Sequence, residues 1–299
     1  MSLRNWIMLV VLGTIWGGSF LFAKVAVAEI PPFVLVFLRV SIACAVLVSI
    51  LWHQKLLGQL KFGLAIPFLI MGLLNNAIPF SLLFLGQTVI GAGLASILNA
   101  TTPVFTVVVA SLLVKQETLQ AHRVGGVILG VLGVAVMLSS SLSGLATDPL
   151  WAQLCCLGAA VSYACAATFA YRFKNLPPQV SATGQLLGSS FLMLPVAIIA
   201  SAGWSPADTS LIAWMNVFAL GVLATALAYL IYFQLLVEAG ATNASLVTLL
   251  VPASALFFGW LILNENLTSA QLGGFAILLA GLLVLDGRVT QLTTGLRKS

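Results

Sequence analysis

The sequence predicts an all-α integral membrane protein with ten transmembrane helices, built as two inverted repeats of five helices each. Three observations predict this fold class: an apolar composition, ten long apolar segments, and an internal repeat with an offset close to 149 residues. Of the 299 residues, 61% are hydrophobic and only 6% are charged, and the mean hydropathy is +1.14. Because soluble domains carry about 25% charged residues, this composition excludes a soluble globular protein.

Each apolar segment is bounded by charged residues or by proline and glycine. A helix needs about 20 residues to cross the hydrocarbon core of a membrane. These runs are too long to be the strands of a membrane barrel. The ten predicted helices span residues 6–27, 33–52, 63–85, 91–113, 123–140, 150–171, 181–202, 211–234, 242–263 and 271–287.

The first segment also resembles a signal peptide, because Arg4 precedes it and Ala26-Val27-Ala28 follows it like a cleavage site. However, the apolar stretch is longer than the usual hydrophobic region, and Lys24 interrupts the cleavage motif. We therefore expect this segment to be retained as the first helix.

Lysine and arginine predict the orientation. With a cytoplasmic N-terminus, ten of the twelve lie in regions on the cytoplasmic side, and only Lys24 and Arg39 lie within helices. The ten are Arg4, Lys55, Lys61, Lys115, Arg123, Arg172, Lys174, Arg288, Arg297 and Lys298. This pattern follows the positive-inside rule and predicts that both termini are cytoplasmic. It also explains the net charge of +5 without a nucleic-acid partner.

The two halves of the chain repeat one another. At an offset of 149 residues, 77–103 aligns with 226–252 without a gap, and at 148 the alignment continues toward the C-terminus. Identical pairs are Ala77/Ala226, Phe84/Phe233, Gly91/Gly240, Ala92/Ala241, Ala95/Ala244, Ser96/Ser245, Pro103/Pro252, Glu117/Glu265, Gly125/Gly273, Gly126/Gly274 and Gly133/Gly281. We predict a first repeat over residues 1–141 and a second over 142–299.

Each repeat holds five helices, an odd number, so the second repeat must be inverted in the membrane relative to the first. Inverted repeats are typical of alternating-access transporters, which hold substrate at mid-membrane between the repeats. The sequence therefore predicts a transporter.

Polar residues at the centres of six predicted helices, the first, third and fourth with their repeat partners, are the candidate substrate-binding residues. They are Trp16, Ser19, Asn75, Asn76, Asn99, Thr101, Thr102, Ser162, Tyr163, Thr225, Tyr229, Ser245 and Thr248. An alternative for these groups is hydrogen bonding between helices without any substrate.

Prolines and glycines mark candidate kinks. Pro79, Pro103 and Pro252 each follow a polar residue by four positions, and a proline frees the carbonyl four residues before it. We expect the freed carbonyls to face protein or water. Gly17 and Gly18 are candidate hinges in the first helix. The glycines of the fifth and tenth helices predict a close helix–helix contact or a dimer contact.

Charged groups within the helices are few. All seven acidic residues lie near helix ends or in loops, which disfavours a dedicated proton-coupled cation pump. Lys24 and Arg39 either extend to the membrane interface, with Lys24 near Glu29, or contact a substrate carboxylate; we favour the interface.

No set of residues predicts catalysis, a metal site or a cofactor. The four cysteines match neither metal-ligand spacing nor a disulfide framework. No phosphate-binding loop is present. A channel or an intramembrane enzyme is therefore a weaker alternative.

Several stretches, in this order along the chain, resemble the EamA type of the drug/metabolite transporter superfamily. They are Trp16–Phe20 followed by Lys24, the Pro31-Pro32 turn and Arg39, Asn75–Pro79, the fourth helix ending in Glu117, the glycine-rich fifth helix, and the second copy with Glu265 and Gly273-Gly274. The resemblance implies a ten-helix transporter of the bacterial inner membrane. Its relatives include YddG-like exporters of aromatic amino acids.

We therefore predict an exporter of amino acids or related small neutral or zwitterionic metabolites. Alternatives are a permease for sugar or nucleotide derivatives and a multidrug exporter. The expected partners are a small-molecule substrate and the lipid bilayer, and the sequence leaves the oligomeric state open. Trp16, Tyr163 and Tyr229 are the main aromatic candidates, fewer than a cavity specialised for aromatic amino acids would need.

Overall fold

The computed structural model describes residues 1–113, 121–142, 148–244 and 246–286, and within them all regular structure is helical. Helices lie at all ten predicted segments. Among the described residues, eight helices are long and apolar enough to cross a membrane, and the shorter apolar helices Val247–Leu263 and Ser269–Leu285 complete the set. The all-α, multi-spanning fold class is confirmed.

The first five spans use seven α-helices and one π-helical segment. They are α1 (Leu3–Val27), α2 (Pro32–His53), a third span of α3 (Ala65–Gly72), η3 (Leu73–Ala77) and α4 (Ile78–Gln87), a fourth span of α5 (Ala92–Asn99) and α6 (Thr102–Leu113), and α7 (Ala121–Leu142). Short 3-10 helices, η1 (Leu57–Gln59) and η2 (Phe62–Leu64), precede the third span.

The second five spans follow the same plan. They are α8 (Leu150–Phe169) extended by η4 (Ala170–Phe173), α9 (Pro178–Ala200), an eighth span of α10 (Leu211–Phe218), η6 (Ala219–Leu227) and α11 (Ala228–Ala239), a ninth span of α12 (Ala241–Ala244) and α13 (Val247–Leu263), and α14 (Ser269–Asp286). The 3-10 helix η5 (Pro206–Asp208) lies before α10.

The third and eighth spans each contain a π-helical segment, and these spans are repeat partners. A π-helical turn shifts the hydrogen-bond register, and such turns are frequent at functional sites. Pro79 is the second residue of α4, directly after η3, so the π-helical segment accommodates a proline that would otherwise break the helix. The repeat partner of Pro79 is Ala228, the first residue after η6. A π-helical segment therefore forms in the eighth span without a proline at this position.

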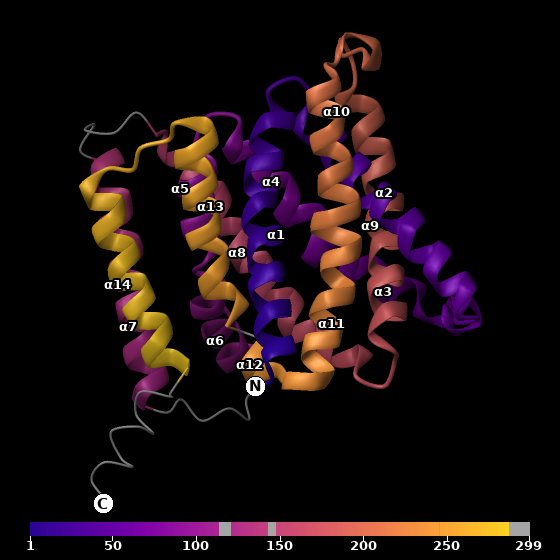
Figure 1. Cartoon of the computed structure of the whole chain (residues 1–299), viewed down its shortest axis with the longest axis horizontal. Coiled ribbons are helices and arrows are strands. Elements are labelled where there is room, and N and C mark those ends of the chain that lie inside the picture. The colour runs from indigo at the N-terminus through magenta and orange to yellow at the C-terminus, as the bar shows by residue number, and fades with distance from the viewer. Residues whose placement is uncertain (114–120, 143–147, 245, 287–299) are drawn as a thin grey trace, which may run out of the picture.

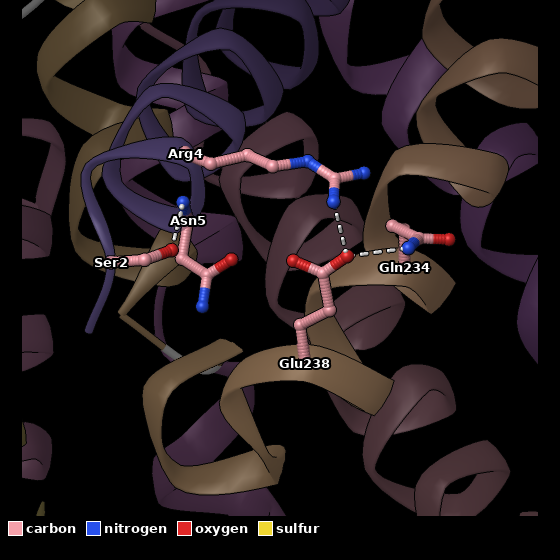
Figure 2. Close-up of polar contacts among 5 residues, drawn as sticks. All are labelled: Ser2, Arg4, Asn5, Gln234 and Glu238. Carbon is pink, nitrogen blue, oxygen red and sulfur yellow. Dashed lines mark hydrogen bonds and ion pairs between the residues drawn. The ribbon is translucent and has the colours of Figure 1, made fainter.

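Helix ends are held by short polar contacts. On the side of the bundle that carries the N-terminus, which we call the N-terminal side, the Ser2 hydroxyl accepts from the Asn5 amide at 3.2 Å (Figure 2). Arg4 pairs with Glu238 at 2.9 Å and joins the start of α1 to the end of α11. This exposed pair contributes little to stability.

On the opposite side, which we call the far side, Glu29 binds Ser210, the N-cap residue of α10. Its carboxylate accepts from the Ser210 amide and hydroxyl, both at 2.7 Å. The backbone hydrogen bond, and then the side-chain one, hold the pKa of Glu29 below its usual value. The link therefore persists at neutral pH and is lost only as the pH falls through that lowered pKa. The expected proximity of Lys24 to Glu29 is wrong, because Glu29 turns to Ser210.

Contacts between helices follow the repeat. The contact of α1 with α13 has its counterpart in that of α6 with α8, and the contact of α4 with α8 has its counterpart in those of α1 with α10 and α11. Two contacts, α2 with α9 and α7 with α14, join repeat partners directly. In Figure 1, α7 and α14 lie side by side at one end of the bundle.

Glycines bring α7 and α14 close together, as the sequence predicts. A Cβ atom on Gly133 would lie 2.7 Å from the Gly274 carbonyl oxygen, and one on Gly274 would lie 2.5 Å from that of Gly133. Gly126 and Gly281 form an equivalent close contact at another point along the two helices. Small residues that allow such close backbone approach are what hold helices together in lipid.

We predict that Gly274→Ala lowers the melting temperature of the detergent-solubilised protein, with a cost of about 1–3 kcal/mol, because the added methyl group must separate the two backbones. Gly273→Ala is the matched control, since no atom lies within 4 Å of a Cβ there. Equal melting temperatures for the two variants would contradict a close-packed α7–α14 contact.

Candidate functional site

A cavity of about 660 Å³ lies at the centre of the bundle. Eight of the ten spans contribute to its wall, and α7 and α14 do not. Helices from both repeats therefore enclose one central space. The second and seventh spans contribute as well, the second through Arg39 and the seventh through residues such as Ser181 and Gln185.

Nine of the candidate residues line this cavity. They are Trp16, Ser19, Asn75, Asn99, Thr102, Tyr163, Thr225, Tyr229 and Thr248. Pro103 and Pro252 also lie on the wall. These residues come from six spans, and the fold brings them together around the same space.

Three candidates are not on the wall, which corrects the prediction for them. Asn76 is fully buried, and its Oδ1 accepts from the Tyr229 hydroxyl at 3.3 Å. The Thr101 hydroxyl donates to the Leu98 carbonyl at 2.6 Å, and the Ser162 hydroxyl donates to the Leu74 carbonyl at 2.7 Å. These hydroxyls and the Asn76 Oδ1 are bonded within the protein, whereas Asn76 Nδ2 is buried without a hydrogen-bond partner away from the cavity wall. Ser245 lies outside the described residues.

The proline bends are only partly as expected. The fourth span breaks between α5 and α6, next to Pro103, but the Asn99 carbonyl accepts from the Thr102 hydroxyl at 2.7 Å. This carbonyl is therefore satisfied locally and is not a free acceptor in the cavity. In contrast, α13 continues through Pro252 without a break.

The candidate hinge residues Gly17 and Gly18 lie within a continuous helix. The helix α1 runs unbroken from Leu3 to Val27. A Cβ atom on Gly17 would contact Ser254 and would lie 2.7 Å from the Val251 carbonyl oxygen. Gly17 thus allows α1 to pack closely on α13.

Arg39 is the main wall residue that was placed wrongly from the sequence. It lies on α2, is only 6% exposed and lines the cavity rather than the membrane interface. Its Nε donates to the Thr225 hydroxyl at 3.0 Å, and its guanidinium carbon lies 3.7 Å from the centre of the Phe80 ring. The only signal in the sequence was a charge about two turns inside an apolar helix.

The wall is more aromatic than the sequence suggested. Trp16 packs on Tyr232 with ring centres 5.5 Å apart, and Phe80 meets Tyr163 edge-on at 6.5 Å. The aromatic wall residues are Trp16, Phe20, Phe80, Phe84, Tyr163, Phe173, Tyr229, Tyr232 and Phe233. The expectation of few aromatic side chains is therefore wrong, since it counted only residues at helix centres.

Amides form a second polar group on the wall. The Asn75 side-chain amide donates to Gln185 Oε1 at 2.8 Å and lies 3.4 Å from the Tyr229 hydroxyl. By contrast, Asn99 Oδ1 and Ser96 Oγ are buried oxygens without a hydrogen-bond partner, and both residues line the cavity. Buried polar atoms are rarely left without a hydrogen-bond partner. These two oxygens have none and belong to residues of a cavity wall, so they are suited to bind a ligand.

The far side of the cavity is closed by hydrogen bonds. The Gln87 side-chain amide donates to the Phe20 carbonyl at 2.8 Å. Lys24 Nζ donates to the carbonyls of Gln87 and Ile90 at 2.8 and 2.9 Å. Gln87 is the last residue of α4 and Ile90 follows it. The helix dipole favours a cation at this C-terminal end. Lys24 is therefore a link between α1 and α4, not a residue extended to the interface.

Glu265 completes this closure. Its two carboxylate oxygens accept from the amides of Ala92 and Gly93, at 2.7 and 2.9 Å, at the start of α5. A helix N-terminus carries unpaired amides and a partial positive charge, which a carboxylate satisfies. Gly91 and Gly259 make room for it, because a Cβ atom there would lie 2.7 and 2.6 Å from Glu265 atoms. Its repeat partner Glu117 lies outside the described residues.

The cavity is open on the N-terminal side. There the wall includes Lys174, which is exposed and follows η4, and the half-buried Pro178 and Ser181 in the first turn of α9. At the far side, the wall residue Gln87 is only 1% exposed and the adjacent Ile90 is fully buried. The structure is therefore open to one side of the bundle and closed to the other.

Comparison with known proteins agrees with this architecture. The sequence model of the EamA-like transporter family matches residues 4–139 and again residues 150–285. The two matched ranges correspond to the first five spans and the second five spans.

Several curated proteins that are named as transporters are similar to this chain over nearly their full length. One is a probable amino-acid metabolite efflux pump of Salmonella typhimurium, 28% identical, with 95% of each chain covered. Another is the uncharacterized transporter YoaV of Bacillus subtilis, 27% identical over 90% of this chain and 91% of that protein. A protein of known crystal structure has a TM-score of 0.65 at 18% identity, covering 94% of this chain and 97% of that one, which shows a shared fold.

We predict that Asn99→Ala keeps the melting temperature of the purified protein, because Asn99 Oδ1 has no partner to lose. Asn75→Ala is the comparison variant. It removes the hydrogen bond to Gln185 and is expected to cost about 1 kcal/mol and lower the melting temperature. A larger loss of stability in Asn99→Ala than in Asn75→Ala would show that Asn99 serves packing rather than the cavity.

Proposed function

The chain belongs to the EamA-like transporter family, and from this premise we propose that it exports amino acids or related small zwitterionic metabolites. The proposed route is alternating access through the central cavity across a bacterial inner membrane. The observation that carries the proposal is the cavity itself, which is enclosed by both repeats, open to the N-terminal side and closed to the far side.

Charge supports the orientation. The described residues Arg4, Lys55, Lys61, Arg172 and Lys174 lie in loops or at helix ends on the N-terminal side. Positive charge marks the cytoplasmic side of a membrane protein. The N-terminal side is then cytoplasmic, and the cavity faces the compartment in which an exporter must load its substrate.

The chemistry of the wall favours amino acids or similar metabolites. Its described charged residues are Arg39 and Lys174, with no acidic side chain among the lining residues. A carrier of organic cations usually holds an acidic residue within the membrane. Amides, hydroxyls and aromatic rings together suit a small solute with polar ends and an apolar body. The printed name of the Salmonella relative points the same way for that protein.

The closure on the far side suggests how access would switch. Outward opening must break the bonds of Lys24 to α4 and of Glu265 to α5 while the N-terminal mouth closes. We propose that the repeats 1–141 and 142–299 exchange these roles, since inverted repeats give two equivalent arrangements of one fold.

We expect purified protein in liposomes preloaded with unlabelled amino acids to accumulate the same amino acid in labelled form by counterflow, with saturation. A carrier saturates because each cycle binds substrate, whereas a channel does not. Protein-free liposomes are the control. If no amino acid of a broad panel exchanges, or if only sugars or nucleosides do, the proposed substrate class is wrong.

We expect Glu265→Gln to weaken the far-side closure, because an uncharged amide accepts helix N-terminal hydrogen bonds less strongly than a carboxylate. The readout is labelling of Ser96→Cys, on the cavity wall, by a membrane-impermeant maleimide added outside cells that carry a version without native cysteines. Labelling is expected to rise several-fold.

The control for this experiment is Asn266→Ala, because Asn266 is an exposed residue of the same loop and makes no hydrogen bond to α5 among those the structure shows. Equal labelling in the Glu265→Gln and Asn266→Ala backgrounds would mean that Glu265 does not hold the closure.

A further inference from the structure

We propose that Arg39 is the carboxylate-binding residue of the cavity, and that the transported solute is held at mid-membrane through a carboxylate group. This inference rests on the proposed function in taking the ligand of the cavity to be the transported solute. It adds a chemical requirement that neither the family nor the cavity alone supplies.

The position of Arg39 is fixed on two sides. Its Nε donates to Thr225 Oγ1 at 3.0 Å, and Thr225 in turn donates to the Leu220 carbonyl in the π-helical segment η6 at 2.8 Å. The guanidinium carbon lies over the Phe80 ring, 3.7 Å from its centre, with the Phe84 ring centre 5.8 Å away. A charged group that is held by a ring face and a single hydroxyl is oriented in advance of any ligand.

The two terminal nitrogens of Arg39 are the unused part of this group. Within the described residues they make no hydrogen bond, although the side chain is only 6% exposed and lines the cavity. A guanidinium has five N–H donors in a fork, and the Thr225 contact uses one of them. Four donors are therefore left for a group in the cavity.

Arg39 also lacks a counter-ion in the described part of the chain. The ion pair that the structure shows there is Arg4–Glu238, at the N-terminal side. No acidic side chain is among the residues of the cavity wall. A charge within the membrane is expensive and marks substrate pathways, because pairing with a ligand can offset its desolvation.

A carboxylate fits this site better than a phosphate group. The planar fork of a guanidinium binds either a carboxylate or a phosphate with two parallel hydrogen bonds, so the charge of the surroundings decides between them. Beyond Arg39, the cationic side chain of the described wall is Lys174, at the exposed mouth, so a dianion would meet one charge at mid-membrane. The unpaired Asn99 Oδ1 on the same wall can accept from an ammonium group, and the aromatic rings can cover an apolar body.

The test measures binding to purified protein in detergent by titration calorimetry with three related probes. They are L-phenylalanine, 3-phenylpropionate, which keeps the carboxylate but lacks the ammonium group, and L-phenylalaninamide, which lacks the carboxylate. The wild type is expected to bind the two carboxylates at least tenfold more tightly than the amide. Arg39→Met should weaken carboxylate binding by roughly tenfold to a hundredfold and abolish this preference. Arg39→Lys should keep part of it, because a point charge replaces the fork.

Equal binding of acid and amide by the wild type, absence of carboxylate binding, or an unchanged preference in folded Arg39→Met would overturn the inference. If Arg39→Met does not fold, as judged by its melting curve, the comparison of the acids with the amide on the wild type still decides. Leu83→Met, a conservative change elsewhere on the wall, is the matched control and should keep the preference.

The outcomes separate this inference from the proposed function. Arg39-dependent binding of 3-phenylpropionate without counterflow of any amino acid would leave the carboxylate site standing and remove amino-acid export. Counterflow of amino acids that L-phenylalaninamide inhibits as strongly as L-phenylalanine would leave export standing and remove the role of Arg39.

Discussion

The hydrocarbon interior of a membrane offers no hydrogen-bond partners, and the arrangement of the ten helices depends on this constraint. Polar side chains at mid-membrane must bond to protein or face a cavity. Ser162 and Thr102 bond to backbone carbonyls that irregular helix geometry would leave free. Arg39 is the most demanding case, because a charge at the bilayer centre costs about 2.5–3.5 kcal/mol on insertion scales. Two of the oxygens that the protein leaves unpaired, Ser96 Oγ and Asn99 Oδ1, belong to residues of the cavity wall, where they bear on what the cavity can bind.

The same constraint separates a fixed part of the molecule from a part that can change. The α7–α14 pair is held by glycine contacts between backbones, carries none of the cavity wall and lies at one end of the bundle. The far-side closure instead uses a few bonds from Lys24, Gln87 and Glu265 to helix ends. Side chains at helix ends can exchange partners at small cost, whereas close backbone contacts cannot. On the proposed alternating-access route, access would switch through the far-side bonds while the α7–α14 contact stays intact.

Much of this could be predicted from the sequence, because apolar length, charge asymmetry and an odd-numbered repeat can be read along the chain without knowledge of side-chain contacts. These gave the ten helices, the glycine contact of the fifth and tenth helices, and most of the polar wall. The wrong predictions concern residues whose contacts depend on the direction in which the side chain extends. Arg39 was taken for an interface residue because a long charged side chain within an apolar helix commonly extends to the interface, but it bonds to Thr225 inside the bundle. Ser162 and Thr101 lie at helix centres but bond to carbonyls, a choice that only three-dimensional packing reveals. Likewise, Pro252 follows the same spacing as Pro103, yet α13 stays continuous.

The central claim is that one cavity alternates between the two sides of the membrane. Spin-label distance measurements in lipid test it most directly, with native cysteines replaced and one label pair on each side. Val89 and Asn266 are exposed positions on the far side, and Tyr171 and Val237 are exposed positions on the N-terminal side. A saturating transported amino acid is predicted to add a longer distance to the far-side pair and a shorter one to the N-terminal pair. A single, unchanged distance for both pairs, in a protein that transports, would contradict alternating access.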